Sequence, residues 1–237
     1  MKLLAIDCSS KTASAAVVDT SEDGSGVVLL GETFLNAGLT HSETLMPMIT
    51  QLLEQTRVSA GQLDLLAVTR GPGSFTGLRI GVSTVIGLAW AKALPCLGVS
   101  SLEAAAWNAA HMGGTVCAVM DARRGRVYRA LFTAAPSGLE RLTGDSAVPL
   151  ETLRGELGGD AILVGDGAEL CRDALADARL TLAPARLRHP TGHGVALAAM
   201  AAGRGAFHSA ELLRPEYCSG PEKYKQYEKG RALRVPE

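Results

Sequence analysis

Short apolar runs alternate with stretches of helical spacing along this chain, and this alternation predicts an α/β protein. Apolar runs at 2–6 and 13–18 are joined by a polar turn, so we expect a β-hairpin, followed by a third strand at 27–35. Residues 40–43, Thr-His-Ser-Glu, have the pattern of a capping box. The helix predicted after it has apolar residues at helical spacing: Leu45, Met48, Ile49 and Leu52.

A buried strand at 63–68, a glycine turn and an apolar helix at 78–91 follow, and Arg79 is the only charged residue of that helix. A helix that is apolar all round is buried on more than one side. Each glycine inside a helix costs about 1 kcal/mol relative to alanine, so we expect another backbone to approach closely where glycine is kept. The helix is therefore either a core helix or one whose second face binds another protein. Its glycines are Gly77, Gly81 and Gly87.

The second half of the chain repeats the first in outline. A strand at 115–120 ends in Asp121, and a polar turn and a returning strand at 127–133 follow it, as the first hairpin follows Asp7. One shared aspartate does not by itself define a duplication. Further elements are a helix at 150–157, a strand at 161–164, a turn at 165–167, a helix from 168 and a helix at 191–202.

Composition indicates a globular protein with one large or two modest domains. The 237 residues are 47% hydrophobic and 20% charged, and the net charge of −1 gives no general basic field, so a nucleic-acid contact needs a local patch or a partner. The 5 cysteines form no CxxC pair and are expected to be reduced, mostly buried thiols. The chain begins in a strand without signal-peptide features, and its apolar helix is too short for a membrane span. We therefore expect a cytoplasmic protein.

Several residues could carry chemistry. His189 and His193 have the spacing of a zinc pair, but Pro190 and Gly192 between them oppose the helix that such a pair needs. His41 has no second histidine at position 45, which is leucine, so no metal site is predicted. Gly-x-Ser-x-Gly is absent, so no nucleophile elbow is predicted either.

The candidate anion sites have simpler structural explanations. Asp7 and Asp121 either hold a hydrated Mg²⁺ beside a nucleotide or cap their turns, and the second interpretation is favoured. The glycine turn matches neither a dinucleotide fingerprint nor a P-loop, so phosphate binding there ranks second to a tight connection. Arg123 and Arg124 either bind phosphate or line the surface, and the surface is favoured. From residue 222 on, the tail has five basic residues, three acidic residues and two tyrosines. A solvated end is favoured over an RNA contact.

Five segments in order resemble the bacterial TsaB (YeaZ) family: 4–10 with 13–19, 71–81, 121–128, 164–168 and 214–217. The resemblance implies an actin-like α/β fold of the sugar-kinase and heat-shock ATPase class, with two related lobes of mixed sheets flanked by helices. We expect a first lobe at 1–102 carrying the partner-binding helices and a second at 103–220. In this division helix 191–205 can pack back on the first lobe, and 221–237 is a mobile tail. The segment after Tyr217 departs from the usual family ending.

The same resemblance implies a function. The chain is expected to be the non-catalytic dimerisation partner and activator of the threonylcarbamoyl transferase TsaD, which forms threonylcarbamoyladenosine in tRNA beside the anticodon. TsaE is the ATPase that joins them. We expect no activity, cofactor or metal in the chain alone and a homodimer when it is free. ATP or ADP is left open at the interface of the complex, and tRNA is contacted through the complex. The alternatives are an ATP-dependent phosphotransferase using Asp7 and Asp121 and, with little weight, a glycoprotease-like metallopeptidase.

Two sets of residues follow from this assignment. The predicted partner interface comprises His41, Leu45, Met48, Ile49, Leu52, Leu78, Arg79, Val82, Val85 and Ile86. The predicted vestigial nucleotide loops comprise Asp7, Ser9, Ser10, Gly71, Gly73, Ser74, Thr76, Asp121, Gly165 and Gly167.

Overall fold

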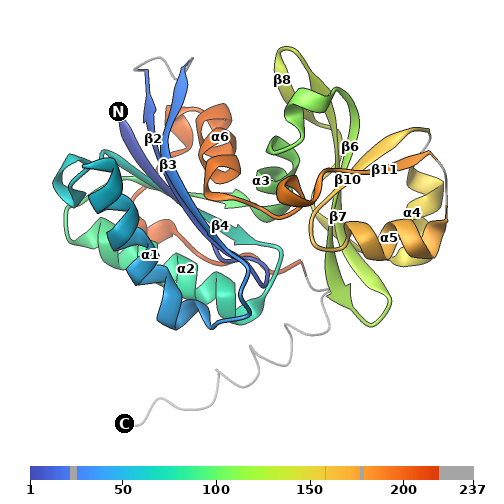
Figure 1. Ribbon diagram of the computed structural model, residues 1–237, viewed down its shortest axis with the longest axis horizontal. Helices are drawn as coiled ribbons and strands as arrows, with labels where there is room; N and C mark the ends of the chain where they lie inside the picture. Colours follow the sequence, from blue (N-terminus) through green and yellow to red (C-terminus); the bar gives the residue numbers. More distant parts are fainter. Residues whose placement is uncertain (22–25, 158, 177–178, 219–237) are drawn as a thin grey trace, which may run out of the picture.

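The computed structural model describes residues 1–21, 26–157, 159–176 and 179–218. Two lobes lie side by side along the long axis of the molecule, and each contains a β-sheet flanked by helices (Figure 1). Within the described ranges, no helix is long and apolar enough to cross a membrane. The predicted mobile tail, 221–237, lies outside the described residues.

The first sheet is built around a middle strand, β1 (Lys2–Asp7). On one side β1 pairs antiparallel with β2 (Ala13–Thr20), which pairs with the edge strand β3 (Val27–Leu35). On the other side it runs parallel to β4 (Leu65–Gly71), which pairs with β5 (Cys96–Ser100). The predicted hairpin and third strand are thus confirmed.

The second sheet has β6 (Gly114–Arg123) in the same middle position. Antiparallel strands lie on one side and parallel strands on the other, as in the first lobe. This shared order, 3-2-1-4-5, confirms two related lobes of mixed sheets, the actin-like arrangement that the resemblance implied. The remaining strands are β7 (Arg126–Ala135), β8 (Gly138–Arg141), β9 (Ser146–Pro149), which pairs with β7, β10 (Ala161–Val164) and β11 (Leu180–Leu182).

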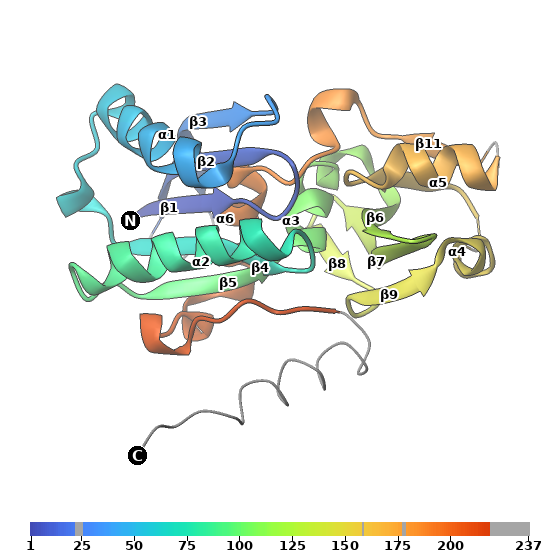
Figure 2. The same ribbon diagram turned by 90° about the horizontal axis from the view of Figure 1, so that it is seen from below.

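Helices cover both faces of the first sheet. α1 (His41–Thr56) and α2 (Phe75–Trp90) lie on one face (Figure 2), and α6 (Gly192–Ala202) covers the other. α3 (Ser101–Trp107) contributes to the cores of both lobes. In the second lobe the helices are α4 (Leu150–Glu156) and α5 (Ala168–Leu175), and single-turn helices occur at Ala60–Gln62, Ala110–Met112, Ala185–Leu187, Arg204–Ala206 and Ala210–Leu212.

Side-chain caps start the helices α2, α3 and α6. Ser74, Ser100 and Thr191 each accept a hydrogen bond from a backbone N–H in the first turn of α2, α3 and α6. Thr40 starts α1 without such a bond, so the predicted capping box is wrong. The Thr40 carbonyl oxygen instead accepts hydrogen bonds from Thr44, whose hydroxyl lies 3.2 Å away.

Alternation along β1 divides its side chains between two cores. Leu4 and Ile6 pack in the core under α1 and α2, whereas Leu3 and Ala5 pack on the opposite face against α6. Because both faces are covered, the strand is apolar from Leu3 to Ile6. A Cβ on Gly192 would overlap the backbone of Ala16, so only glycine lets α6 approach the sheet this closely. The chain thus returns to the first sheet after completing the second.

Candidate functional site

Asp7 lies fully buried at the carboxyl end of β1. Its Oδ1 accepts hydrogen bonds from the Ser9 hydroxyl at 2.6 Å, the Thr69 hydroxyl at 2.7 Å and the Ser9 N–H at 3.1 Å. Its Oδ2 accepts none from any described residue. Burial raises the pKa of Asp7 to about 6, and the hydrogen bonds from Ser9 and Thr69 oppose that shift. The group is therefore held by one oxygen only, and the other is a buried acceptor without a donor.

The glycine turn packs directly on the loop after β1. The Ser74 N–H donates to the Ser9 carbonyl oxygen at 2.7 Å, and the Gly77 N–H donates to the Ser74 hydroxyl at 3.2 Å. Cβ atoms on Gly73 and Gly77 would overlap the carbonyl oxygens of Ser9 and Cys8. An anion site needs free N–H groups at the helix N-terminus, and these two are already bonded within the protein. The turn serves as a tight connection, the interpretation that the sequence favoured.

The other residues of the first-lobe loop set are dispersed. The Ser10 hydroxyl lies 2.8 Å from that of Thr12, so the two form a hydrogen bond. Gly71 packs against the backbone of Glu216, whose N–H donates to the Arg70 carbonyl oxygen. Thr76 is exposed in the first turn of α2. The structure thus brings Asp7, Ser9, Gly73 and Ser74 together but leaves Ser10, Gly71 and Thr76 with other partners or in solvent.

Asp121 caps its own turn in the second lobe. Its Oδ1 accepts the Arg123 N–H at 2.7 Å, and its Oδ2 lies 3.2 Å from the Arg123 guanidinium. Its own N–H donates to Asp166, a carboxylate that sequence reasoning did not single out. Gly165 and Gly167 pack closely against the backbone of β6. Burial raises the pKa of Asp166, while Lys11 of the first lobe and Arg123 lower it. Charged groups of both lobes thus act on the carboxylate of Asp166.

These loops meet only part of what a nucleotide requires. Asp7 offers an unpaired carboxylate oxygen, which suits a hydrated cation, but Asp121 is committed to Arg123 and the glycine turn to Ser9. Among the described residues, no three His, Cys, Asp or Glu side chains are grouped to hold a metal ion. His193 lies in the first turn of α6 and His189 precedes that helix, so the two do not share one helical face.

Most of the predicted partner residues are buried in the first lobe. The partner-surface prediction is wrong for these side chains, because they are buried within the protein: Leu45, Met48, Ile49, Leu52, Leu78, Val82 and Val85. All of them except Met48 and Leu78 belong to the core between the sheet and its two helices. Ile86 is half-buried against the same core, and Arg79 is exposed. The ring of His41 is half-buried, with its Nε2 3.1 Å from the Thr12 carbonyl oxygen. Only these last three remain as predicted interface residues.

The exposed residues of the two helices are the sequence neighbours of predicted interface residues, such as Met46 beside Leu45 and Gly87 beside Ile86. Met46 is 45% exposed on α1 and Trp90 is 68% exposed on α2. Pro47 and Thr50 of α1 and Ser83 and Gly87 of α2 are also exposed and uncharged, and the two helices expose charge at Glu43, Glu54 and Arg79. The sequence of α2 does not distinguish its exposed face from its buried face, since the residues on both faces are mostly apolar or small.

Gly87 differs from the other glycines of α2. Gly77 and Gly81 are required by the protein's own packing, because a Cβ on either would meet residues of the first sheet or of the loop after β1. A Cβ on Gly87 would have no heavy atom within 4 Å, and the residue is exposed. Packing within the described chain therefore does not account for this helix-destabilising residue.

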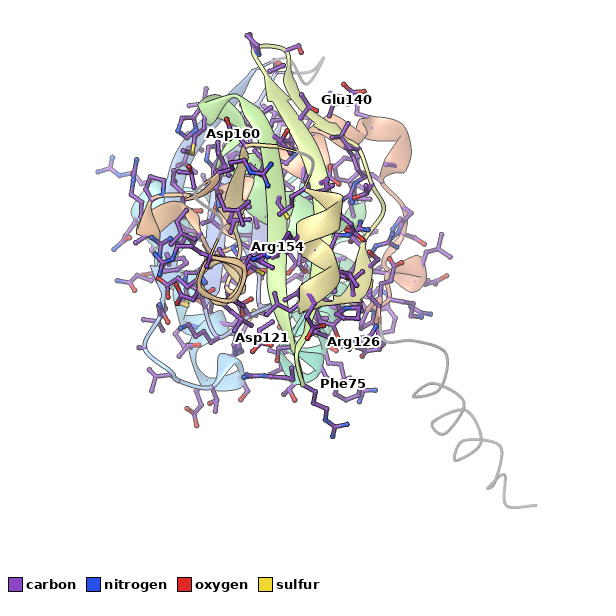
Figure 3. All side chains as sticks on the ribbon, turned by 90° about the vertical axis from the view of Figure 1, so that its right-hand side faces the viewer. Phe75, Asp121, Arg126, Glu140, Arg154 and Asp160 are labelled. Atoms are coloured by element: carbon purple, nitrogen blue, oxygen red, sulfur yellow. The ribbon has the colours of Figure 1, made fainter. Side chains whose placement is uncertain are left out.

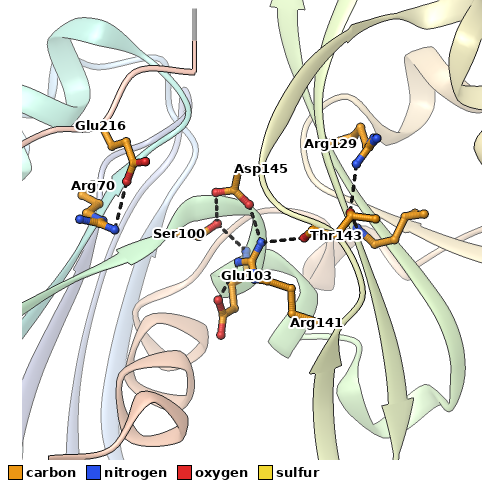
Figure 4. A network of polar contacts seen from close by, with 9 residues as sticks. Arg70, Ser100, Glu103, Arg129, Arg141, Thr143, Asp145 and Glu216 are labelled. Carbon is orange, nitrogen blue, oxygen red and sulfur yellow. Dashed lines mark hydrogen bonds and ion pairs between the residues drawn. The ribbon is translucent and has the colours of Figure 1, made fainter. Parts of the chain in front are cut away.

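A polar network joins the lobes beside a cavity of about 360 Å³ (Figure 4). Arg141 of β8 donates to Asp145 at 2.6 Å and to Glu103 of α3 at 2.7 Å, and its guanidinium lies 4.7 Å from the ring centre of Phe132. The Ser100 hydroxyl, which caps α3, donates to the other oxygen of Asp145 at 2.6 Å. The polar groups of this network are paired with one another, which indicates a structural link between the lobes.

Comparison with known proteins agrees with this architecture. A family model described as TsaD, tRNA N6-adenosine threonylcarbamoyltransferase, matches residues 36–222. A relative from Bacillus subtilis, "tRNA threonylcarbamoyladenosine biosynthesis protein TsaB", is 37% identical over 150 residues, which are 63% of this chain and 63% of the relative. The protein of the same name from Escherichia coli is 32% identical over 176 residues, covering 70% of this chain and 76% of the relative. The match thus spans slightly less than two thirds of the Bacillus subtilis protein.

Solved structures give the same result. A structure described as YeaZ from Pseudomonas aeruginosa has a TM-score of 0.74 and 28% identity over 91% of this chain and 99% of that chain. A second from the same organism, with similarity to peptidase YEAZ, has a TM-score of 0.77 and 27% identity over 92% of this chain and 99% of that one. Duplicated mixed sheets define a two-lobed actin-like α/β protein. Within that class the chain belongs to the family of the TsaD model and to its TsaB (YeaZ) members.

Proposed function

We propose that this chain is a non-catalytic partner and activator of a TsaD-type threonylcarbamoyltransferase, acting in the formation of threonylcarbamoyladenosine in tRNA. The family and the names of its relatives support this role. The loops that would hold a nucleotide also support it, because the glycine turn and Asp121 already form hydrogen bonds and an ion pair within the protein. The contribution of the chain is then a docking surface for the enzyme.

Exposed Gly87 is the observation that carries the proposal. Glycine in a helix interior is less favourable than alanine by about 1 kcal/mol, and the described structure gives no packing reason for it at this position. Close approach of a second backbone would supply that reason. The neighbouring exposed side chains Met46 and Trp90 would give such a contact the apolar anchors on which interfaces depend.

The dimensions of the two helices suit a protein partner. α1 and α2 have 16 residues each, which corresponds to a length of about 24 Å. Six exposed residues of these helices carry no charge, which suits the centre of an interface, and the same helices also expose Glu43, Glu54 and Arg79. The face defined by Met46, Pro47, Thr50, Ser83, Gly87 and Trp90 is called the α1–α2 face below.

Gly87→Arg tests this surface. The variant places a long charged side chain on the α1–α2 face, and we expect affinity for the TsaD partner to fall by about 100-fold or more in titration calorimetry. Its midpoint of thermal unfolding should stay the same or rise, because arginine is a better helix former than glycine. The tRNA of cells whose only copy is Gly87→Arg should lack threonylcarbamoyladenosine by mass spectrometry of nucleosides.

Gly155→Arg is the matched control. Gly155 is also exposed in a helix, α4, and a Cβ there would have no heavy atom within 4 Å. This variant should pair and function as the unmodified protein does. Unchanged affinity of Gly87→Arg for TsaD would remove the α1–α2 face from the proposal.

The further partners follow from the same face. When TsaD is absent, the α1–α2 face would pair with a second copy, so the free chain would be a homodimer that Gly87→Arg converts to a monomer in light-scattering measurements. TsaE would join the pair, tRNA would be bound through the complex, and ATP or ADP would bind at the joint interface. The expected location of these steps is the cytoplasm.

One observation favours a second candidate, an ATP-dependent phosphotransferase. The unpaired Oδ2 of Asp7 is the kind of oxygen that accepts a hydrogen bond from a cation-bound water. Mg²⁺-dependent ATP binding by the isolated chain, lost in Asp7→Asn, would support that function. Absence of ATP binding at millimolar concentrations would eliminate it.

A further inference from the structure

The tip of the β6–β7 hairpin has arginine where hairpin geometry favours glycine or asparagine. Arg123 and Arg126 are paired across the strands, so Arg124 and Gly125 form a two-residue loop. The φ angles of Arg123, Arg124 and Gly125 are 65°, 55° and 70°, all in the left-handed region. A side chain disfavours that region, and two-residue loops of this kind prefer Asn-Gly. Unfavourable backbone conformations of this sort cluster at functional sites, which makes the tip a candidate.

Little within the protein restrains these arginines. The Arg123 guanidinium contacts Asp121 at 3.2 Å, yet its side chain is 86% exposed. Arg126 donates to the Ala147 carbonyl oxygen at 2.7 Å and is exposed. Arg124 is exposed and makes no hydrogen bond or ion pair with any residue in the described ranges. The tip therefore presents the charges of Arg124 and Arg126, which pair with no carboxylate among the described residues, beside the Arg123–Asp121 ion pair.

A second basic and aromatic cluster lies on the first lobe at the same end of the molecule. The Arg79 guanidinium lies 3.9 Å from the ring centre of Phe75, and its Nε donates to the Tyr217 hydroxyl at 3.1 Å. The Phe75 and Tyr217 rings stack with centres 5.1 Å apart. In Figure 3, Phe75 and Arg126 lie at the same height at the lower end of the molecule, and Figures 1 and 2 place the start of α2 opposite β7.

Basic residues also occur in neighbouring segments. Lys11 belongs to the turn between β1 and β2, and its charge and that of Arg123 both lower the pKa of Asp166. The chain continues from Tyr217 into a segment whose residues 222–237 include five basic and three acidic side chains. An extended polyanion is the ligand that such spaced cations and exposed aromatic groups recognise.

We propose that the β6–β7 tip, together with the Arg79–Phe75–Tyr217 cluster, binds the phosphate backbone of RNA directly. This inference rests on the proposed function for the choice of RNA as the polyanion, since the family and its named relatives concern tRNA. Arg124 makes a phosphate contact, and Arg79 and Phe75 contact the same strand from the other lobe. The chain then holds the substrate of the complex as well as the enzyme.

Arg124→Asn separates binding from folding. Asparagine tolerates the left-handed conformation, so the midpoint of thermal unfolding should rise by about 1–3 °C while the charge is lost. Affinity for a fluorescein-labelled tRNA transcript at 100 mM KCl should fall about five- to tenfold. The slope of log affinity against log salt concentration should decrease in magnitude by about 1. Both the isolated chain and its complex with TsaD are measured.

Arg57→Asn is a matched control, because Arg57 is exposed with φ 55° at the end of α1. It should gain the same thermal stability and retain RNA affinity. Equal RNA affinity of Arg124→Asn and the unmodified chain, or equal losses in both variants, would overturn the proposal. So would the absence of binding to the transcript by the unmodified chain and complex. A complex that forms normally with Arg124→Asn but binds RNA as before contradicts the RNA contact and leaves the proposed partnership intact.

Discussion

The carbonyl oxygen of Ser9 occupies the space into which a side chain on Gly73 would project, and it accepts the N–H of Ser74 at 2.7 Å. The loop after β1 and the turn before α2 are thereby joined backbone to backbone. The same contact uses a donor at the helix N-terminus that an anion would otherwise need. One hydrogen bond thus accounts for both the close packing of the turn and its poor fit to phosphate.

Gly73→Ala should lower the free energy of unfolding by about 3 kcal/mol, because a Cβ would overlap a backbone oxygen at a φ of 153°. Gly38→Ala is the control, since Gly38 has a φ of 68° with no heavy atom within 4 Å of a Cβ. That change should lower the free energy of unfolding by about 1 kcal/mol. Urea denaturation measures both, and equal losses would mean that the overlap is relieved at no cost.

Asp7 should make stability depend on pH. Its pKa is about 6 in the folded protein, compared with 3.8 for an unperturbed aspartate, so the folded protein holds the proton more tightly than the unfolded chain does. The stabilisation from the protonated group is fully present below about pH 4 and is lost as the pH rises through 6. The loss is about 3 kcal/mol at pH 8. Asp7→Asn should remove this loss, and the measurement is urea unfolding from pH 4 to pH 8. If the free energy of unfolding depended on pH in the same way in both proteins, the raised pKa of Asp7 would be contradicted.

Arg141 should matter more for stability than a surface arginine. Arg141→Met leaves Glu103 and Asp145 without their partner between the lobes, and we expect the free energy of unfolding to fall by about 2 kcal/mol. A double-mutant cycle with Glu103→Gln should give a coupling energy of about 1 kcal/mol. The exposed pair Arg172 and Asp173 is the comparison, and its loss should change stability by less than about 0.5 kcal/mol. A coupling near zero would show that the network does not link the lobes energetically.

The thiols should differ sharply in reactivity. Cys8, Cys96, Cys117 and Cys171 are fully buried, and burial raises the pKa of each. Cys218 is half-buried, and burial raises its pKa to about 11, so at pH 7.5 it reacts slowly. A maleimide label followed by mass spectrometry should modify Cys218 alone in the native protein and all 5 cysteines in guanidinium. Modification of Cys8 without unfolding would contradict its burial.

The local pattern of apolar and polar residues was sufficient to predict most of the helices and strands. Apolar runs predicted the hairpin at β1 and β2, and helical spacing predicted α1, because both patterns are properties of a single segment. The strands β8, β9 and β11 were not predicted, since none of them is an apolar run like the equally short β10, Ala161–Val164. The actin-like class came from the resemblance, and the matching order of the two sheets confirmed it.

The sequence by itself determined where most of the strands and helices lie and which family the chain resembles. Only the tertiary structure decided which side of α2 is buried. Gly81 and Gly87 look alike in the sequence, yet one touches the sheet and the other faces solvent. The physical reason is that burial depends on residues far along the chain, such as Cys8 and Val68 against Gly81, and a helix apolar all round has no polar side to reveal that choice.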